Sequence, residues 1–153
     1  MFKKILLATD GSPDAEQALE YARDLALRDG AQLIVVHAFE PVPRYLGEPG
    51  WDRATGRRVS AGQKVANDAA QRLGEAGVDI VVELLEGPPA DAILKVADVR
   101  ECDLIVMGSR GHGALASLVL GSVSRGVLAG ARAPVLVVRA RKQEAEEGPP
   151  SMF

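Results

Sequence analysis

The sequence lacks several features that mark specialised classes of protein. Its single cysteine, Cys102, excludes a disulfide within the chain and suits a reducing cytosol. Its net charge of −3 leaves no broad basic surface for nucleic acid. No apolar stretch approaches the roughly 18 residues of a membrane span, and the apolar run at residues 5–8 is shorter than the roughly 7–15 residues of a signal-peptide core. These absences predict a cytoplasmic protein that binds neither nucleic acid nor a membrane.

Aliphatic residues, by contrast, are plentiful and gather in short runs. Five such runs hardly alternate with polar residues; they cover residues 5–8, 33–36, 80–85, 104–107 and 135–138. A strand with one face in water would alternate, so these runs predict strands that are covered on both faces. With 153 residues, 47% of them apolar, the chain is long enough to bury one ordinary core.

Helical patterns fill the gaps between these runs. Ser12 and Pro13 predict a helix start, with a hydroxyl cap and a proline in the first turn, and Gly30 predicts the end of that helix. Apolar stripes of helical spacing also cross residues 59–73, 90–97 and 123–131. The alternation predicts an α/β fold: an open five-stranded parallel sheet with helices on both faces. We expect one domain over residues 1–140, with a loop insertion at 41–56 and a disordered tail at 141–153.

The glycine-rich stretch MGSRGHGALASLVLGSVS, residues 107–124, begins at the end of the fourth predicted strand. Ligands of open α/β sheets bind at the carboxyl ends of strands, where the strand order reverses. Gly108 and Gly111 would permit positive φ and close approach of a ligand. Gly121 and Ser122 stand where the last helix should begin, so free amides would favour an anion there, with the hydroxyls of Ser122 and Ser124 as further donors. The stretch predicts a phosphate cradle; a flexible glycine-rich connection is the alternative.

Two better-known phosphate motifs compete with this interpretation. The pattern G-x-x-x-x-G-K-[ST] of P-loop proteins is absent. Residues 111–116, GHGALA, fit the dinucleotide form G-x-G-x-x-A, but they follow the fourth strand rather than the first. The fifth strand also ends at Arg139, where NAD binding favours an acid, and Gly121 would fall inside a helix at a cost of about 1 kcal/mol. The dinucleotide motif is therefore the weaker alternative.

The spacing Gly108-x-x-Gly111, nine residues, Gly121-Ser122-Val-Ser124 resembles the ATP-binding signature of the universal stress proteins. Four further blocks resemble the same family in the same order: ILLATDGS at 5–12, VH at 36–37, EGP at 86–88 and APVLVV at 133–138. The resemblance spans residues 2–139. It implies a Rossmann-like fold of the adenine nucleotide α-hydrolase type with strand order 3-2-1-4-5. It also implies a homodimer that pairs through Val135–Val138.

The resemblance further implies bound ATP, with Mg²⁺ held mainly by the phosphates. Carried over position by position, it implies these cofactor-binding residues: Ala8, Thr9 and Asp10 at the adenine or ribose, Ala38 and Met107 around the adenine pocket, and Gly108, Gly111, Gly121, Ser122, Val123 and Ser124 at the ribose and phosphates. As an alternative role, the Asp10 carboxylate would only accept from amides of the following helix turn. For Arg110 and His112 in the loop, contact with phosphate and contact with solvent both stay open.

Catalytic machinery is not evident in the sequence. There is no Ser-His-Asp triad, no paired acid and base carboxylates and no zinc cluster, and a structural role suits His37. We therefore expect a nucleotide-dependent stress-response switch or interaction module, with an unknown protein partner and at most slow hydrolysis. Two alternatives remain open: a nucleotide-free dimeric interaction module, and an enzyme that hydrolyses adenine nucleotides with Asp10 or His37 recruited to the chemistry.

Overall fold

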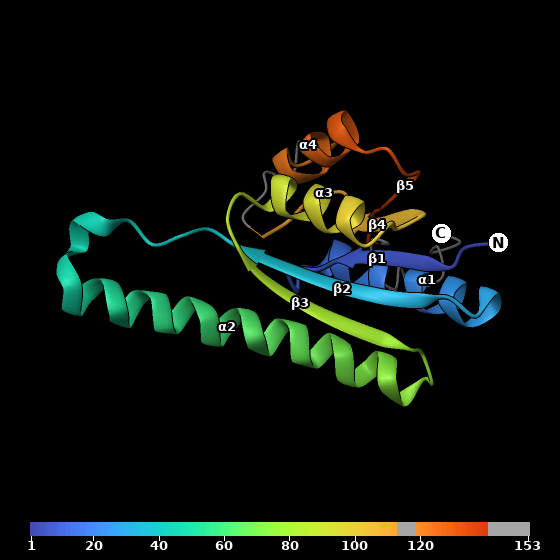
Figure 1. The fold of residues 1–153 in the computed structure, drawn as a ribbon, viewed down its shortest axis with the longest axis horizontal. Coiled ribbons are helices and arrows are strands. Elements are labelled where there is room, and N and C mark those ends of the chain that lie inside the picture. Colours follow the sequence, from blue (N-terminus) through green and yellow to red (C-terminus); the bar gives the residue numbers. More distant parts are fainter. Residues whose placement is uncertain (113–118, 141–153) are drawn as a thin grey trace, which may run out of the picture.

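The computed structural model describes residues 1–112 and 119–140, which form a three-layered α/β/α fold (Figure 1). A five-stranded sheet has the order β3-β2-β1-β4-β5, and every neighbouring pair is parallel. Its strands are β1 (Lys4–Ala8), β2 (Gln32–Phe39), β3 (Ile80–Glu86), β4 (Leu104–Gly108) and β5 (Val135–Val138). The helices described are α1 (Pro13–Asp29), the short 3₁₀ helix η1 (Arg44–Leu46), α2 (Gly47–Glu75), α3 (Pro89–Val99) and α4 (Ser122–Gly130). The predicted fold class and strand order are both confirmed.

The two faces of the sheet are covered by different helices because alternate strand residues point to opposite sides. On one face Ile5, Leu7 and Val106 pack with apolar residues of α1 and α2. On the other face Leu6 and Met107 pack with apolar residues of α3 and α4. All five of these strand residues are less than 5% exposed, which accounts for the lack of polar alternation in the sequence.

The strand order reverses between β1 and β4. From β1 the chain builds outward through β2 and β3, then returns to the other side of β1 and builds outward through β4 and β5. The register pairs Ala8 with Val36 on one side and with Met107 on the other. The carboxyl ends of the three central strands therefore lie level, and the loops that leave β1 and β4 in opposite directions open a crevice between them.

The ends of α1 agree with the sequence prediction. The hydroxyl oxygen of Ser12 accepts a hydrogen bond from the amide of Ala15 at 3.3 Å, as an N-cap does. Gly30 ends the helix with φ of 65°, a conformation that costs glycine little.

The loop insertion predicted over residues 41–56 is wrong for most of its length. Residues 44–46 form η1, and α2 begins at Gly47 and runs for 29 residues. Pro49 lies in the first turn, where backbone N–H groups make no hydrogen bond within the helix, so the missing N–H of proline costs nothing there. Two side chains of α2 hold the segment that precedes it. The indole N–H of Trp51 donates to the carbonyl of Val42 at 3.2 Å, and the guanidinium of Arg58 donates to the carbonyl of Glu40.

The second half of α2 is the part that packs on the sheet. Its buried residues, Gly62, Ala66, Ala69 and Leu73, all belong to that half, and the first half extends past the carboxyl end of β2 (Figure 1). Among the described residues, no helix combines the length and apolar character needed to cross a membrane. The predicted tail at 141–153 and residues 113–116 of the dinucleotide motif lie outside the described ranges.

Candidate functional site

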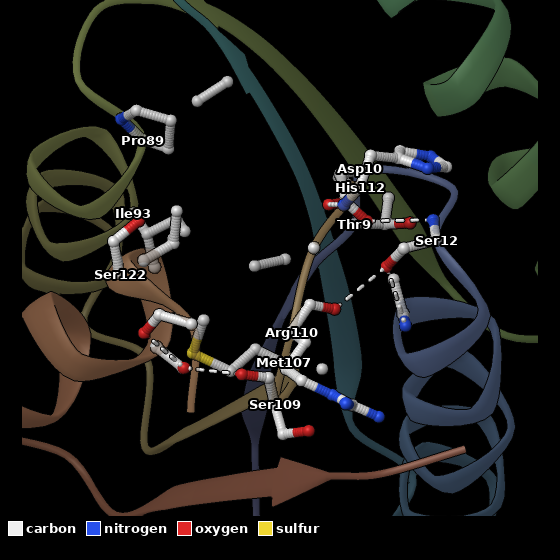
Figure 2. A pocket seen from close by; sticks show the side chains of 18 of the residues that line it. Thr9, Asp10, Ser12, Pro89, Ile93, Met107, Ser109, Arg110, His112 and Ser122 are labelled. Atoms are coloured by element: carbon white, nitrogen blue, oxygen red, sulfur yellow. Dashed lines mark hydrogen bonds between the residues drawn. The ribbon is translucent and has the colours of Figure 1, made fainter. Parts of the chain in front are cut away.

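A cavity of about 490 Å³ opens where the carboxyl ends of β1 and β4 meet. Its volume is in the usual range for a small-molecule site, roughly 300–1,000 Å³. All eleven residues predicted to contact a cofactor line it: Ala8, Thr9, Asp10, Ala38, Met107, Gly108, Gly111, Gly121, Ser122, Val123 and Ser124. These residues come from the ends of β1, β2 and β4 and from the start of α4 (Figure 2).

Other residues that line the cavity were not singled out from the sequence. Pro89 and Ile93, from the first turns of α3, face the cavity opposite the β1 end (Figure 2). Together with Val36 and Met107 they give it an apolar wall. A helix start with an apolar residue four positions later is ordinary core patterning, so nothing in the sequence marks Ile93 as a site residue.

Asp10 joins the loop after β1 to the loop after β4. Its Oδ1 accepts from the amide of Ser12 at 2.9 Å, and its Oδ2 accepts from the amide of His112 at 3.3 Å. The hydroxyl of Ser12 also lies 3.4 Å from the carbonyl oxygen of Arg110 (Figure 2). Asp10 therefore does accept from backbone amides, which is the alternative role that the sequence left open. Each carboxylate oxygen still has a second lone pair that could accept from another donor.

The glycines of the loop are needed for space rather than for positive φ, which corrects the sequence prediction. Gly108, Gly111 and Gly121 all avoid the positive φ region. A Cβ at Gly108 would lie 2.8 Å from the amide nitrogen of Ala15, and one at Gly111 would lie 2.6 Å from Oδ2 of Asp10. Gly108 therefore lets β4 pack on the start of α1, and Gly111 lets the loop approach Asp10.

The start of α4 presents open backbone amides to the cavity. Gly121 is the N-cap, with φ of −75°, and it has no side chain to cap the first turn. The amides of Ser122, Val123 and Ser124 occupy positions at which a helix supplies no acceptor. The hydroxyl of Ser124 is buried, and its one proton is shared between the carbonyl oxygens of Ser109 at 2.8 Å and Gly121 at 3.0 Å. The expected hydroxyl donor at Ser124 is therefore engaged elsewhere, whereas Ser122 is exposed.

Basic side chains also border the cavity. Arg110, His112 and Arg125 are among the lining residues, and Arg110 and His112 lie in the loop that follows β4. Asp10 is the one carboxylate among the described residues that line it. In residues 1–112 and 119–140, no group of three or more His, Cys, Asp or Glu side chains could hold a metal ion. The site is arranged for an anion next to an apolar body.

Asp14, in the first turn of α1, binds the loop that follows β4 through hydrogen bonds. It is 5% exposed and accepts hydrogen bonds from the hydroxyl of Ser109 at 2.6 Å, the amide of Arg110 at 3.1 Å and the amide of Ala140 at 2.8 Å. Burial raises the pKa of the Asp14 carboxyl, but these hydrogen bonds and the charge of Arg110 outweigh burial and hold the pKa below its ordinary value of 3.8. Asp14 was not predicted, because an acid in the first turn of a helix is common on any surface.

Comparison with known protein families identifies the family of this chain. The model of the Universal stress protein family matches residues 1–139. The chain belongs to that family.

Individual relatives cover almost the whole of this universal stress protein. A universal stress protein of Thermus aquaticus is 51% identical over 139 residues, which are 91% of this chain and all of the relative. The structure of UspA from Lactobacillus plantarum has a TM-score of 0.77 and 26% identity, over 90% of this chain and 97% of that one. A universal stress protein solved in complex with cAMP has a TM-score of 0.67 and 28% identity, over 92% of this chain and 98% of that one.

Two reactive side chains of this universal stress protein are held in structural contacts. Nδ1 of His37 lies 2.8 Å from the carbonyl oxygen of Thr9, and because a carbonyl only accepts, Nδ1 carries the proton. The ring also packs against α2 so closely that a Cβ at Gly62 would lie 2.9 Å from its Cδ2. Cys102 is buried, and burial raises the pKa of its thiol. The contacts of His37 agree with the structural role expected for it from the sequence.

Proposed function

We propose that this universal stress protein binds an adenine nucleotide, ATP together with Mg²⁺, in the cavity between β1 and β4. One observation carries the proposal: an apolar wall and the uncapped start of α4 share a single cavity of suitable volume. The apolar wall suits a purine base, and the free amides at the start of α4 suit phosphate oxygens. The bound cAMP of a relative with 28% identity supports an adenine nucleotide as the ligand class.

Each part of the nucleotide has suitable residues in the cavity. Ala8, Ala38 and Met107, with Ile93 opposite, would hold the base between apolar surfaces. Asp10 would accept from the ribose hydroxyls through the lone pairs that its amide contacts leave unused.

The phosphates would lie against the amides of Gly111 and of the α4 start at Ser122 and Val123. These donors need no lysine, because the helix dipole adds positive potential at the same place. Arg110 and Arg125 would contribute charge at the rim.

Mg²⁺ fits the site as a companion of the phosphates rather than as an ion held by the protein. Asp10, which lines the cavity, would offer one carboxylate, and Mg²⁺ commonly takes one or two carboxylates with the rest of its shell from phosphates and water. When bound, the ion would neutralise phosphate charge. The protein would hold it through the nucleotide and, at most, through Asp10.

Nucleotide binding would serve as a switch, with at most slow hydrolysis. His37 is engaged with Thr9 and α2, and the Asp10 lone pairs left by its two amide contacts would be taken by the ribose, so neither residue would orient an attacking water. The bound nucleotide would change the affinity of the protein for a protein partner. We further propose a homodimer that pairs through β5 (Val135–Val138), the edge strand of the sheet, whose open backbone groups offer a row of hydrogen bonds.

The test is to denature the freshly purified protein and identify any released nucleotide by chromatography. Thermal unfolding with added Mg-ATP provides a second measurement, with a stabilisation of about 2.7 kcal/mol expected at a hundredfold excess over Kd. Gly121→Val should abolish both signals. The extended backbone at Gly121 accepts valine, but the branched side chain would press on the Arg110 and Ser109 backbone, 3.4 Å from the Cβ position.

Gly74→Val is the matched control, because no heavy atom lies within 4 Å of a Cβ at Gly74. It should retain both signals. A wild-type protein that contains no nucleotide and shows no thermal shift with Mg-ATP would contradict the proposal and favour the nucleotide-free module. Multiple turnovers of ATP that Asp10→Ala abolishes would instead favour the hydrolytic enzyme.

A further inference from the structure

The two oxygens of the Asp14 carboxylate hold two different parts of the chain. Oδ2 accepts from the hydroxyl of Ser109 and from the amide of Arg110, so it fixes the loop that leaves β4. Oδ1 accepts from the amide of Ala140, two residues beyond the end of β5. One buried, rigid group therefore contacts the candidate phosphate loop on one side and the exit of the edge strand on the other.

Ser109 extends this connection to α4. Its amide donates to the carbonyl of Val138 in β5 at 2.8 Å, and its carbonyl accepts from the amide of Gly121 at 2.7 Å and from the hydroxyl of Ser124. Its hydroxyl donates to Asp14. The residue is 3% exposed, so α1, β5 and the start of α4 are joined through it without intervening solvent.

Close packing leaves these contacts little freedom to move independently. The space for a Cβ at Gly108 is already filled by the backbone of Asp14 and Ala15. A shift of the 109–111 loop must therefore move Asp14, and a rotation of the carboxylate that favours Oδ2 contacts must alter the geometry at Oδ1. Packed interiors transmit such shifts because they contain few voids.

We propose that Asp14 is a positioning residue that couples phosphate binding in the cavity to the backbone at the end of β5. This inference rests on the proposed nucleotide function. Phosphate bound by the amide of Gly111 would hold the loop in the arrangement in which Ser109 and Arg110 donate to Asp14 Oδ2, and the same carboxylate then holds Ala140. Coupling between two sites is reciprocal, so loss of the Asp14 contact weakens nucleotide binding by the factor by which nucleotide strengthens that contact.

The experiment compares wild type with Asp14→Asn and, as a control on the same helix, Asp24→Asn. The Asp24 side chain is 73% exposed and pairs with its neighbour Arg23. Isothermal titration with Mg-ATP and with adenosine separates phosphate contacts from base contacts. We expect Asp14→Asn to weaken Mg-ATP binding about tenfold, the scale of one charge-assisted hydrogen bond, and to leave adenosine affinity unchanged. Asp24→Asn should match wild type with both ligands.

The rate of amide hydrogen exchange at Ala140 distinguishes coupling from a purely structural role of Asp14, because only coupling makes this rate depend on Mg-ATP. Mg-ATP should slow exchange of this amide in wild type and in Asp24→Asn, but not in Asp14→Asn. Ser109→Ala, which removes only a hydroxyl, should weaken Mg-ATP binding in the same direction, and its effect should largely disappear in the Asp14→Asn background. This second variant keeps the test decisive if Asp14→Asn folds poorly.

The outcomes separate the two proposals. If wild type binds neither Mg-ATP nor adenosine, the proposed function fails. If wild type binds Mg-ATP but Asp14→Asn binds it equally well, or if Ala140 exchange does not respond to Mg-ATP, the coupling is refuted while the function stands. Equal weakening of Mg-ATP and adenosine would also refute it, because Asp14 would then only support the fold.

Discussion

Gly108→Ala tests how tightly the candidate site is packed against α1. The added Cβ would lie 2.8 Å from the amide nitrogen of Ala15 and 2.9 Å from the backbone carbon of Asp14. Both atoms belong to the backbone of the first helical turn, so no side-chain rotation relieves the contact and α1 must move away from β4. Overpacking of this kind costs about 1–3 kcal/mol. Each kcal/mol lowers Tm by about 2–4 °C in a domain of this size.

Urea unfolding, followed by far-UV circular dichroism, measures the free energy of unfolding of wild type and Gly108→Ala. The control is Gly56→Ala, on the exposed first half of α2, where no heavy atom lies within 4 Å of a Cβ. This control should be more stable than wild type by about 0.5–1 kcal/mol, because alanine favours a helix more than glycine does. A Gly108→Ala protein as stable as wild type, beside a stabilised control, would refute the close packing of β4 on α1.

Three further predictions concern Asp14, Gly111 and β5. Because hydrogen bonds hold the pKa of Asp14 below 3.8, its stabilisation is complete above about pH 5 and is lost as the pH falls through the folded-state pKa. Urea unfolding from about pH 5 to about pH 2 should show that loss, and Asp14→Asn should reduce the slope; an unchanged slope would contradict the assignment. Gly111→Ala should displace the Asp10 carboxylate, 2.6 Å from the new Cβ, and weaken Mg-ATP binding about tenfold in a titration, whereas unchanged affinity would separate Asp10 from the site. Sedimentation equilibrium at micromolar concentration should detect a dimer formed through β5 (Val135–Val138), and a monomer would exclude that pairing.

The sequence was sufficient to predict the sheet because its signals are local. The strand runs are solid with aliphatic residues since both faces are covered, and Ser12 and Gly30 mark the two ends of α1 by chemistry that acts within one turn. The carboxyl ends of β1 and β4 then had to meet if the strand order was 3-2-1-4-5. For this reason the predicted residues Asp10 and Gly121 both line the cavity.

Features that depend on distances between elements could not be predicted in the same way. The need for glycine at position 108 arises from the backbone of the first turn of α1, at Asp14 and Ala15, which lies more than 90 residues away along the chain. Asp14 has the pattern of an ordinary first-turn acid, and only the tertiary structure brings Ser109 and Ala140 to it. The early start of α2 depends on contacts of Trp51 with the preceding segment, whereas its glycines and proline locally indicate a loop.

The central position of β1 has a consequence for how the chain acquires its structure during synthesis. Its pairing partner β4 lies about one hundred residues downstream, with Ile5 opposite Leu104. At about 5–20 residues per second, a ribosome therefore completes β4 some 5–20 s after β1. During that interval one edge of β1 has no neighbour, and the crevice beside it does not exist. The cavity can be completed only after β4 and α4 have emerged, so a nucleotide could stabilise the finished protein but could not template the early steps of its folding.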